Sequence, residues 1–378
     1  MSKFNFEFQI KTKIKFGRNK IKEINSTLNS LAAKNFMVVI DKGIIEAGIF
    51  AKIEAILKKS DLNYYIFDKV TPDPTIEIVN SAVEFVLENN IDSLLAVGGG
   101  SPIDTAKAVI ASFLDNQLAK EISGDRLSLV TIPTTAGSGS EVTKAIVIKD
   151  QKTKKKFAFI DEDIAPNVAI VDPELTKSLP TFLTAVGGMD ALSHCIESYL
   201  SQDAVLPFEM IATKGIEMVK VYLRPAVGNG NNMAAREGMA LASLFGGIAL
   251  TNCGLGLVHA ISHPVGGNFN IPHGLSNAIL LPHVMKFNLI SNPKKYANIA
   301  RIFGVNIDEC TEMEAANRAV EEIKKLKEDI GITESLRDFK VDKFEKIAEL
   351  ALEEKLMLKS NPRPVNKSDV IKILKDAY

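Results

Sequence analysis

A change in hydrophobic periodicity near residue 180 is the feature of this sequence that most restricts its fold. Before that point, short apolar runs alternate with helical patterns, whereas the pattern from residue 181 to residue 378 is almost entirely helical. An alternation of strands and helices is typical of a parallel sheet with helices on its faces. We therefore predict an α/β domain over residues 1–180 and an all-α domain over residues 181–378, joined without a low-complexity linker.

The periodicity also predicts individual elements in the first domain. Strands are expected at residues 36–40, 64–67, 93–97 and 127–132, with helices at 48–59 and from the loop 71–75 through residue 89. The N-terminal residues 1–16 alternate as a strand does. A basic run at residues 152–156 lies between two further strand-like segments, 145–148 and 157–160. This run is typical of the solvated tip of a hairpin.

Charge and composition exclude several classes of protein. With 45 Lys and Arg against 46 Asp and Glu, the net charge is −1, which argues against a nucleic-acid-binding protein. The longest charge-poor stretch, residues 238–258, contains five glycines and predicts a buried helix rather than a membrane span. The N-terminus has no apolar signal region, and three cysteines are too few for a disulfide framework. We expect a cytoplasmic protein that binds neither nucleic acid nor a membrane.

Two loops rich in glycine and hydroxyl groups follow successive strands. The first, residues 98–104 (GGGSPID), leads into a helix for which we expect Ser101 as the N-cap and Asp104 at the third helical position. The second, residues 134–141 (TTAGSGSE), follows the next strand. The first loop alone is equally consistent with a well-capped turn. Two such loops at one sheet edge favour a dinucleotide, whose phosphates bind backbone N–H groups at a helix N-terminus.

Asp41 lies at the end of an earlier strand, where its charge would affect which dinucleotide binds. A carboxylate in that place accepts hydrogen bonds from the adenosine ribose and repels a 2′-phosphate, which favours NAD over NADP. The alternative is that Asp41 only caps the turn that follows it.

The histidines are concentrated in one segment, since four of the five lie within residues 254–283. His259 and His263 are four apart and so share a helix face, and His194 follows Asp190 at the same interval. One carboxylate and three imidazoles suit Fe(II), Zn(II) or another borderline divalent ion. The predicted metal ligands are Asp190, His194, His259 and His273. His263 is left as a fifth ligand or a proton carrier, and His283 is expected to be structural.

The motif HAISH also allows the hypothesis of a zinc peptidase to be tested. A zincin requires HExxH with glutamate as general base, and Ala260 occupies the glutamate position here. A metallopeptidase is therefore not expected. A metal-dependent lyase or other hydrolase that binds no nucleotide remains an alternative, because the histidine cluster alone does not require a dinucleotide.

Taken together, these motifs give the chain a family resemblance that runs nearly end to end. The sequence resembles the iron-containing (group III) alcohol dehydrogenases in TPDPT, GGGSPIDTAKA, IPTTAGSGSEVT, KFAFID, PNVAIVDPEL, GGMDALSHCIESYLS, GLGLVHAISHPVGG, IPHGLSNAILLPHVMKFN and SNPRPVN. The resemblance implies a Rossmann-like nucleotide domain, a helical metal-binding domain, and the same four metal ligands. It implies NAD and a divalent metal as cofactors, with Fe(II) favoured and Zn(II) as the alternative. It also implies that His263 contacts cofactor or substrate and relays protons.

The resemblance further implies which residues contact the cofactor and the substrate. The cofactor contacts are Asp41, Asp73, Gly99, Gly100, Ser101, Asp104, Thr134, Thr135, Ser138 and Lys156. Asp73 departs from several members, which have Asn there. The substrate pocket falls at Leu250 and Met357, whose apolar side chains favour a short unbranched substrate.

The expected activity is that of a short-chain ethanol or 1-propanol dehydrogenase, acting on a small primary alcohol, diol or aldehyde. A glycerol dehydrogenase-like polyol oxidoreductase is the alternative within the superfamily, although those sites typically use one carboxylate and two histidines. We expect a homodimer or larger homo-oligomer. The subgroup includes enzymes of bacterial microcompartments, which is a second expectation for location beside the cytoplasm.

Overall fold

The computed structural model describes residues 5–114, 127–153 and 156–378. The chain forms two compact units. The sheet unit consists of Gln9–Thr135 and Gly139–Leu179, and the helical unit consists of Pro180–Tyr378 with the N-terminal residues up to Phe8 and the short segment Ala136–Ser138. The main division of the chain therefore falls between Leu179 and Pro180.

The sheet unit is built on six parallel strands in the order β1-β8-β5-β4-β2-β3. Their bounds are β1 Lys13–Phe16, β2 Asn35–Asp41, β3 Asn63–Val70, β4 Ser93–Gly98, β5 Ser128–Pro133 and β8 Val168–Val171. The strands predicted at residues 36–40, 64–67, 93–97 and 127–132 are confirmed. Because β4 lies between β2 and β5, the loops that follow these three strands leave the same edge of the sheet.

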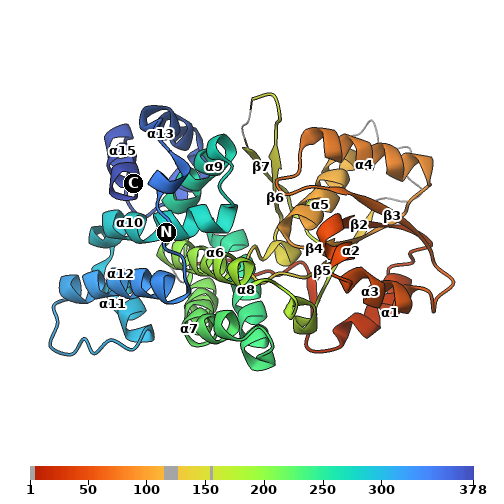
Figure 1. Cartoon of the computed structure of the whole chain (residues 1–378), viewed down its shortest axis with the longest axis horizontal. Coiled ribbons are helices and arrows are strands. Elements are labelled where there is room, and N and C mark those ends of the chain that lie inside the picture. The colour runs from red at the N-terminus through yellow and green to blue at the C-terminus, as the bar shows by residue number, and fades with distance from the viewer. Residues whose placement is uncertain (1–4, 115–126, 154–155) are drawn as a thin grey trace. The chain divides into compact units, whose positions relative to one another are not determined.

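Helices cover both faces of this sheet (Figure 1). Alternate residues of β2 enter different cores: Phe36 and Val38 pack with residues of α1 and α3, and Met37 and Val39 pack with residues of α4 and α5. This two-sided burial explains why β2 is an uninterrupted apolar run rather than an alternating one. The helices are α1 Ile24–Ser30, α2 Lys42–Glu46, α3 Ile49–Leu57, α4 Ile76–Glu88 and α5 Gly100–Leu114.

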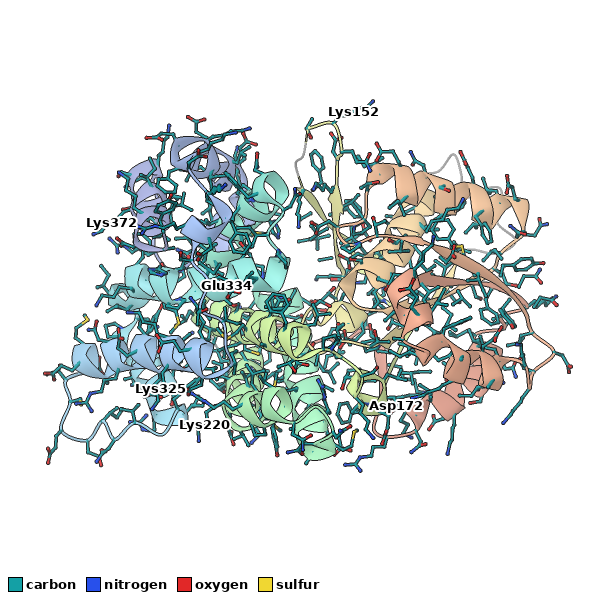
Figure 2. The ribbon with its side chains drawn as sticks, viewed as in Figure 1. Lys152, Asp172, Lys220, Lys325, Glu334 and Lys372 are labelled. Atoms are coloured by element: carbon teal, nitrogen blue, oxygen red, sulfur yellow. The ribbon has the colours of Figure 1, made fainter. Side chains whose placement is uncertain are left out.

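A separate antiparallel hairpin follows the second glycine-rich loop. It pairs β6 Ala145–Lys149 with β7 Lys156–Ile160, which confirms the hairpin predicted around the basic run. Lys152 is exposed at its tip, as Figure 2 shows, while Lys154 and Lys155 of that run lie outside the described residues.

The strand predicted over residues 1–16 is wrong for most of its length. Within the described residues of this segment, only Lys13–Phe16 forms a strand, paired with β8. Phe8 instead stacks on Phe208 of the helical unit, with ring centroids 4.9 Å apart. An aromatic contact with a helix therefore replaces the sheet pairing that the alternation suggested.

The helical unit is organised around α6, Thr181–Leu200, in which nearly every residue from Thr184 onwards is buried. A helix that is buried on all sides must be enclosed by other helices, and α7, α8 and α10 pack against it. The remaining bounds are α7 Leu206–Gly228, α8 Met233–Cys253, α9 Leu257–Phe269, α10 His273–Asn288, α11 Pro293–Ile302, α12 Glu312–Asp329, α13 Phe344–Glu353, α14 Lys355–Ser360 and α15 Lys367–Asp376. The fold class predicted from the sequence is confirmed.

The single buried helix predicted over residues 238–258 is also wrong in its extent. Helix α8 ends at Cys253 and α9 begins at Leu257, with a bend of 106° between the two. Gly254 has a φ of +73°, which glycine adopts without strain, and a ψ of 179°, which takes the chain out of the helix. Among the described residues, no single helix is long and apolar enough to cross a membrane; only the bent pair α8–α9 passes that test, by length and composition.

Candidate functional site

Three helices bring one carboxylate and three imidazoles together inside the helical unit. Asp190 and His194 lie one turn apart on α6, His259 lies on α9, and His273 is the first residue of α10. One potential ligand atom from each of the four lies within 4.8 Å of the others. His263 does not belong to this group. The predicted ligand set therefore combines a pair of residues on α6 with two histidines that follow it in the sequence by 65 residues or more.

The carboxylate of Asp190 lies among the three imidazoles. Its Oδ1 is 3.5 Å from His194 Nε2, 3.8 Å from His259 Nε2 and 3.6 Å from His273 Nε2. Burial alone would raise the pKa of Asp190, but the adjacent imidazoles hold this pKa well below its usual range. Burial lowers the pKa of His194 despite Asp190, and so favours the neutral imidazole that a metal ion binds.

Access to this group is uneven. The side chain of His273 is 32% exposed, whereas those of Asp190, His194 and His259 are at most 8% exposed. The His273 side of the cluster is therefore the side from which a small molecule can reach it.

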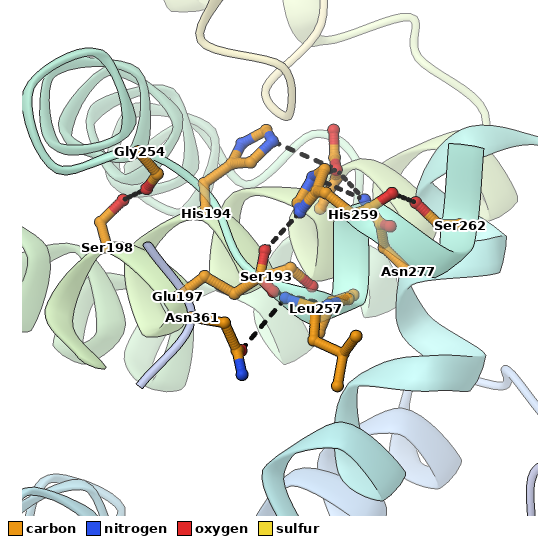
Figure 3. Close-up of polar contacts among 12 residues, drawn as sticks. Ser193, His194, Glu197, Ser198, Gly254, Leu257, His259, Ser262, Asn277 and Asn361 are labelled. Atoms are coloured by element: carbon orange, nitrogen blue, oxygen red, sulfur yellow. Dashed lines mark hydrogen bonds and ion pairs between the residues drawn. The ribbon is translucent and has the colours of Figure 1, made fainter. Parts of the chain in front are cut away.

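Glu197, which the sequence analysis missed, orients His259 (Figure 3). Its Oε2 lies 2.5 Å from His259 Nδ1, and its Oε1 accepts a hydrogen bond from Val258 N at 2.6 Å. A carboxylate that binds the Nδ1 proton leaves the lone pair on Nε2, which is the atom that faces Asp190. Glu197 follows His194 by three residues on α6, so helical spacing was the available signal.

The contact between Glu197 and His259 can be tested through the protonation of His259. The test uses protein from which a chelator has removed any metal ion. Burial lowers the pKa of His259, but Glu197 and Asp190 outweigh burial and raise it from 6.5 to about 9. A raised histidine pKa stabilises the fold below the unfolded value and loses that contribution as pH rises through the folded value. We expect the free energy of unfolding to fall by about 3 kcal/mol from pH 6.5 to 9, since one proton is worth about 1.4 kcal/mol per pH unit.

Urea unfolding across this pH range measures the effect. In Glu197→Gln the carboxylate that holds the proton is absent, so the decline is expected to be smaller and to end at lower pH. A variant with the same decline as the wild type would show that another group is responsible.

Asn277 is the second residue that the sequence analysis missed. It lies one turn after His273 on α10, and its Nδ2 donates to Asp190 Oδ1 at 2.7 Å. The same nitrogen is 3.0 Å from His259 Nε2 and 3.2 Å from His273 Nε2. The Asn277 amide therefore links the Asp190 carboxylate to the imidazoles of His259 and His273.

Side chains from distant segments also cap the first turn of α9. Leu257 N donates to Asn361 Oδ1 at 3.3 Å, and Val258 N donates to Glu197 Oε1 (Figure 3). These N–H groups have no acceptor within the helix, so the two side chains fix where the helix begins. Asn361 belongs to the late motif SNPRPVN. That motif thus acts on the site through the helix that carries His259.

His263 lies one turn beyond His259 on α9 and is also buried. Its Nδ1 is 3.6 Å from Glu354 Oε1, and the ring centroids of His263 and His273 are 5.6 Å apart. The side chain of Glu354 is 23% exposed. His263 therefore lies between the ligand group and a carboxylate that reaches solvent. His283, expected to be structural, is half-buried on α10 outside the ligand group.

In the sheet unit, the loops after β2, β4 and β5 meet at the predicted edge. Thr134 N donates to Gly98 O at 2.9 Å, and the Thr135 side chain packs against Gly99. Gly98 has a φ of +148°, and a Cβ there would lie 2.6 Å from Pro102 and 3.3 Å from Asp41 Oδ2. Only glycine fits this approach, which brings Asp41 against the first loop.

Asp41 does cap the following helix, because its Oδ1 accepts a hydrogen bond from Ile44 N at 3.1 Å. The alternative left open by the sequence is thus observed. This capping bond uses only Oδ1, and the second oxygen, Oδ2, faces Gly98. The capping bond therefore does not exclude the predicted contact with the ribose.

Two of the residues predicted to contact the cofactor form an ion pair with each other. Lys156 Nζ on β7 donates to Asp73 Oδ1 at 2.6 Å, from the loop between β3 and α4. Asp73 has a φ of +53°, in the left-handed region that both Asp and Asn tolerate. The Asp-for-Asn departure therefore leaves the backbone of this loop unchanged.

The expected start of α5 requires correction. The helix begins at Gly100, so Ser101 is inside its first turn and is not the N-cap. Asp104 is not part of a capping box: its carboxylate accepts hydrogen bonds from Ser140 Oγ at 2.5 Å and Val147 N at 3.0 Å. The physical reason is tertiary, because Ser140 and strand β6 supply the donors that the helix terminus would otherwise have supplied. Ser138, the remaining predicted cofactor residue, falls in the helical unit.

Residues 11–173 match the iron-containing alcohol dehydrogenase family, and residues 184–378 match the C-terminal part of the Fe-containing alcohol dehydrogenase family. The chain is 38% identical over 388 residues to 1,3-propanediol dehydrogenase of Citrobacter freundii, covering 100% of both chains. It is 37% identical over 369 residues to NAD-dependent methanol dehydrogenase of Bacillus methanolicus, covering 96% of this chain and 97% of that protein. A crystal structure of 1,3-propanediol oxidoreductase aligns with a TM-score of 0.94 at 37% identity, covering 99% of this chain and 100% of that one.

Proposed function

The chain belongs to the iron-containing alcohol dehydrogenase family, and on that premise we propose that it transfers a hydride between NAD(H) and a short-chain primary alcohol or aldehyde at a divalent-metal centre. The observation that carries the proposal is the buried group of Asp190, His194, His259 and His273. We propose these four residues as the metal ligands.

The chemistry of the donor set fits a metal ion. Four ligands about 2.0–2.2 Å from one ion lie roughly 3–4 Å from one another, and the carboxylate–imidazole separations fall in that range. Glu197 fixes the tautomer of His259 so that a lone pair points into the group. The family name supports Fe(II), and Zn(II) is the alternative because nitrogen and oxygen ligands accept either ion.

When bound, the metal supplies Lewis-acid polarisation of the substrate oxygen, and the nicotinamide supplies or accepts the hydride. The protein's own residues supply the rest. Asp190 and the three imidazoles hold the ion, while Glu197 and Asn277 orient two of these ligands. His263 is the residue proposed to carry the hydroxyl proton, since an imidazole titrates near neutral pH and Glu354 lies next to it.

Two features support dinucleotide binding at the loops of the sheet unit. The N-terminus of α5 follows Gly98 and Gly99, so its first N–H groups are available to a phosphate. Thr134 Oγ1 is buried and has no hydrogen-bond partner within the described part of the chain. A buried hydroxyl of this kind fits a site whose partner is a ligand. Gly99, Gly100, Ser101, Thr134 and Thr135 are the proposed contacts here.

Two apolar side chains of the predicted substrate pocket, together with the substrates named for the relatives, support the proposal of a short substrate. Leu250 is partly buried and Met357 is buried, and both are apolar. The relatives named above act on 1,3-propanediol and methanol. A glycerol dehydrogenase-like activity is less favoured because this chain offers three histidines rather than two.

One spectrophotometric assay tests the proposal. NADH absorbance is followed with ethanol or propanal, 1,3-propanediol and glycerol, with and without added Fe(II) or Zn(II) under anaerobic conditions. Metal-dependent turnover of a short alcohol or aldehyde is the expected result. Absence of NADH turnover with every substrate in the panel would favour a lyase or hydrolase.

Replacement of Asp41 tests the preference for NAD. Asp41→Gly removes the charge that would repel a 2′-phosphate, and we expect the ratio of kcat/KM for NADPH to that for NADH to rise by about tenfold or more, since one close like-charge contact is worth more than 1 kcal/mol. Glycine is chosen because at an N-cap it destabilises a helix by only a few tenths of a kcal/mol. An unchanged ratio would leave Asp41 with its capping role alone.

The oligomeric state and the cellular location stay predictions. We propose a homo-oligomer, which sedimentation analysis of the metal-loaded protein tests directly.

A further inference from the structure

A small cavity lies beside Glu197, inside the helical unit. The space in it that is open to the centre of a water molecule measures about 10 Å³, which is the room that one water molecule needs. Helices α6, α9, α10 and α11 and the motif SNPRPVN contribute to its walls. Most of the lining side chains are apolar. Four are polar and at most 7% exposed, namely Glu197, Asn288, Tyr296 and Asn361.

Tyr296, on α11, supplies a hydroxyl group that needs a partner in this cavity. The residue is 0% exposed, and among the residues that the structure describes its hydroxyl has no hydrogen-bond partner. Burial raises the pKa of Tyr296, and the carboxylate of Glu197 raises it further, so the phenol keeps its proton at neutral pH. A buried hydroxyl of this kind is costly unless it is bonded, and water is a common partner.

The other polar walls of the cavity offer acceptors. Glu197 already binds Val258 N and His259 Nδ1, but a carboxylate accepts up to about four hydrogen bonds. Asn288 Oδ1 accepts a hydrogen bond from Asn361 Nδ2 at 3.0 Å, and an amide oxygen can accept two. A water that accepts from Tyr296 and donates to Glu197 and Asn288 would make three hydrogen bonds, the usual number for buried water.

We propose that this cavity binds one structural water, and that Tyr296 acts through this water as a positioning residue for His259. Tyr296 orients the water, the water donates to Glu197, and Glu197 holds the Nδ1 proton of His259. A third donor stabilises the buried Glu197 carboxylate, and groups that orient a metal ligand in this way add to metal affinity. The positioning role rests on the proposed function, because it requires His259 to be a metal ligand.

A crystal structure that resolves ordered water tests the site itself. In the wild type, one water is expected within hydrogen-bond distance of the Tyr296 hydroxyl and the Glu197 carboxylate. A dry cavity would overturn the proposal, and so would a direct hydrogen bond from Tyr296 to Glu197 with no water between them.

Tyr296→Phe tests the positioning role, because it removes the hydroxyl and keeps the ring. We expect the Kd of Zn(II), measured in competition with a chelator, to rise by about tenfold, at the lower end of the effect of a group that orients a ligand. Tyr199→Phe is the matched control. It removes a buried hydroxyl from α6 that accepts a hydrogen bond from Asn298 Nδ2, and Tyr199 is not among the described residues that line the cavity.

A double-mutant cycle tests whether the effect passes through Glu197. In a Glu197→Gln background the charged acceptor is absent, so Tyr296→Phe is expected to change the Kd of Zn(II) by about twofold or less. A tenfold effect that persists in this background would overturn the route through Glu197. A general loosening of the fold would instead weaken Zn(II) binding in the Tyr199→Phe control as well, and would overturn the positioning role.

The outcomes separate this inference from the proposed function. A wild type that binds no divalent metal would overturn the proposed function and the positioning role together, while the crystal structure would still decide whether the cavity holds a water. A wild type that binds Zn(II), with a Tyr296→Phe variant of unchanged Kd, would overturn the positioning role and leave the proposed function intact.

Discussion

Replacement of His259 by alanine is expected to abolish metal retention and catalysis together. The variant loses one of the four proposed ligands and leaves Glu197, whose Oε2 lies 2.5 Å from His259 Nδ1, as a buried carboxylate without that partner. The fall in kcat/KM is expected to exceed about a thousandfold, since Lewis-acid stabilisation of a substrate oxygen is worth several kcal/mol. Metal analysis after anaerobic purification and the NADH assay are performed on the same sample.

His283→Ala is the matched control for this experiment. His283 is half-buried on α10, the helix that begins with His273, but it is outside the ligand group. The control is expected to retain both metal and activity, which separates the loss of a ligand from the loss of any histidine. Full turnover by a His259→Ala variant shown to be free of metal would refute the ligand assignment.

The group of Asp190, His194, His259 and His273 was predictable in part, because two pairs at helical spacing supply three of its members. Asp190 and His194 are four residues apart, and so are His259 and His263. This interval places both members on one face whatever the tertiary structure. The sequence predicted His259 as a ligand and left open whether His263 is a fifth ligand or a proton carrier. The structure places a ligand atom of His259, but not of His263, within 4.8 Å of those of Asp190, His194 and His273.

Glu197 and Asn277 were not predicted as site residues, although their spacing from His194 and His273 is also helical. Glu197 follows His194 by three residues, and Asn277 follows His273 by four. A Glu or Asn on a helix face usually faces solvent, so spacing alone gives it no particular role. Their roles arise from contacts with a second helix: Glu197 on α6 binds the ring and the first turn of α9, and Asn277 on α10 binds Asp190 on α6.

The errors in the fold have the same origin. Local periodicity suggested one helix over residues 238–258 and a capping box at Asp104. The first failed because side chains of Glu197 and Asn361, distant in the sequence, start a new helix at Leu257. The second failed because Ser140 and Val147 occupy the carboxylate of Asp104. In both cases a long-range hydrogen bond overrode a sound local signal.

Replacement of His263 by alanine is expected to have the second largest effect, and of a different kind. Because His263 lies beside the ligand group but outside it, the variant should keep its metal. Its kcat is expected to fall by about 10²–10⁴, the usual contribution of a positioned general acid or base. The neighbouring carboxylate gives a graded comparison: Glu354→Gln leaves the imidazole in place, and a smaller loss is expected.

The dependence of rate on pH distinguishes proton transfer from mere packing at this residue. If His263 carries the hydroxyl proton, the wild-type kcat should depend on pH, and that dependence should be weaker in His263→Ala. A variant that is slower by a constant factor at every pH would assign His263 to positioning of cofactor or substrate. Loss of metal from the variant would instead make His263 a ligand. Only the combination of retained metal, reduced kcat and a flattened pH profile supports a proton path from the substrate hydroxyl through His263 towards Glu354.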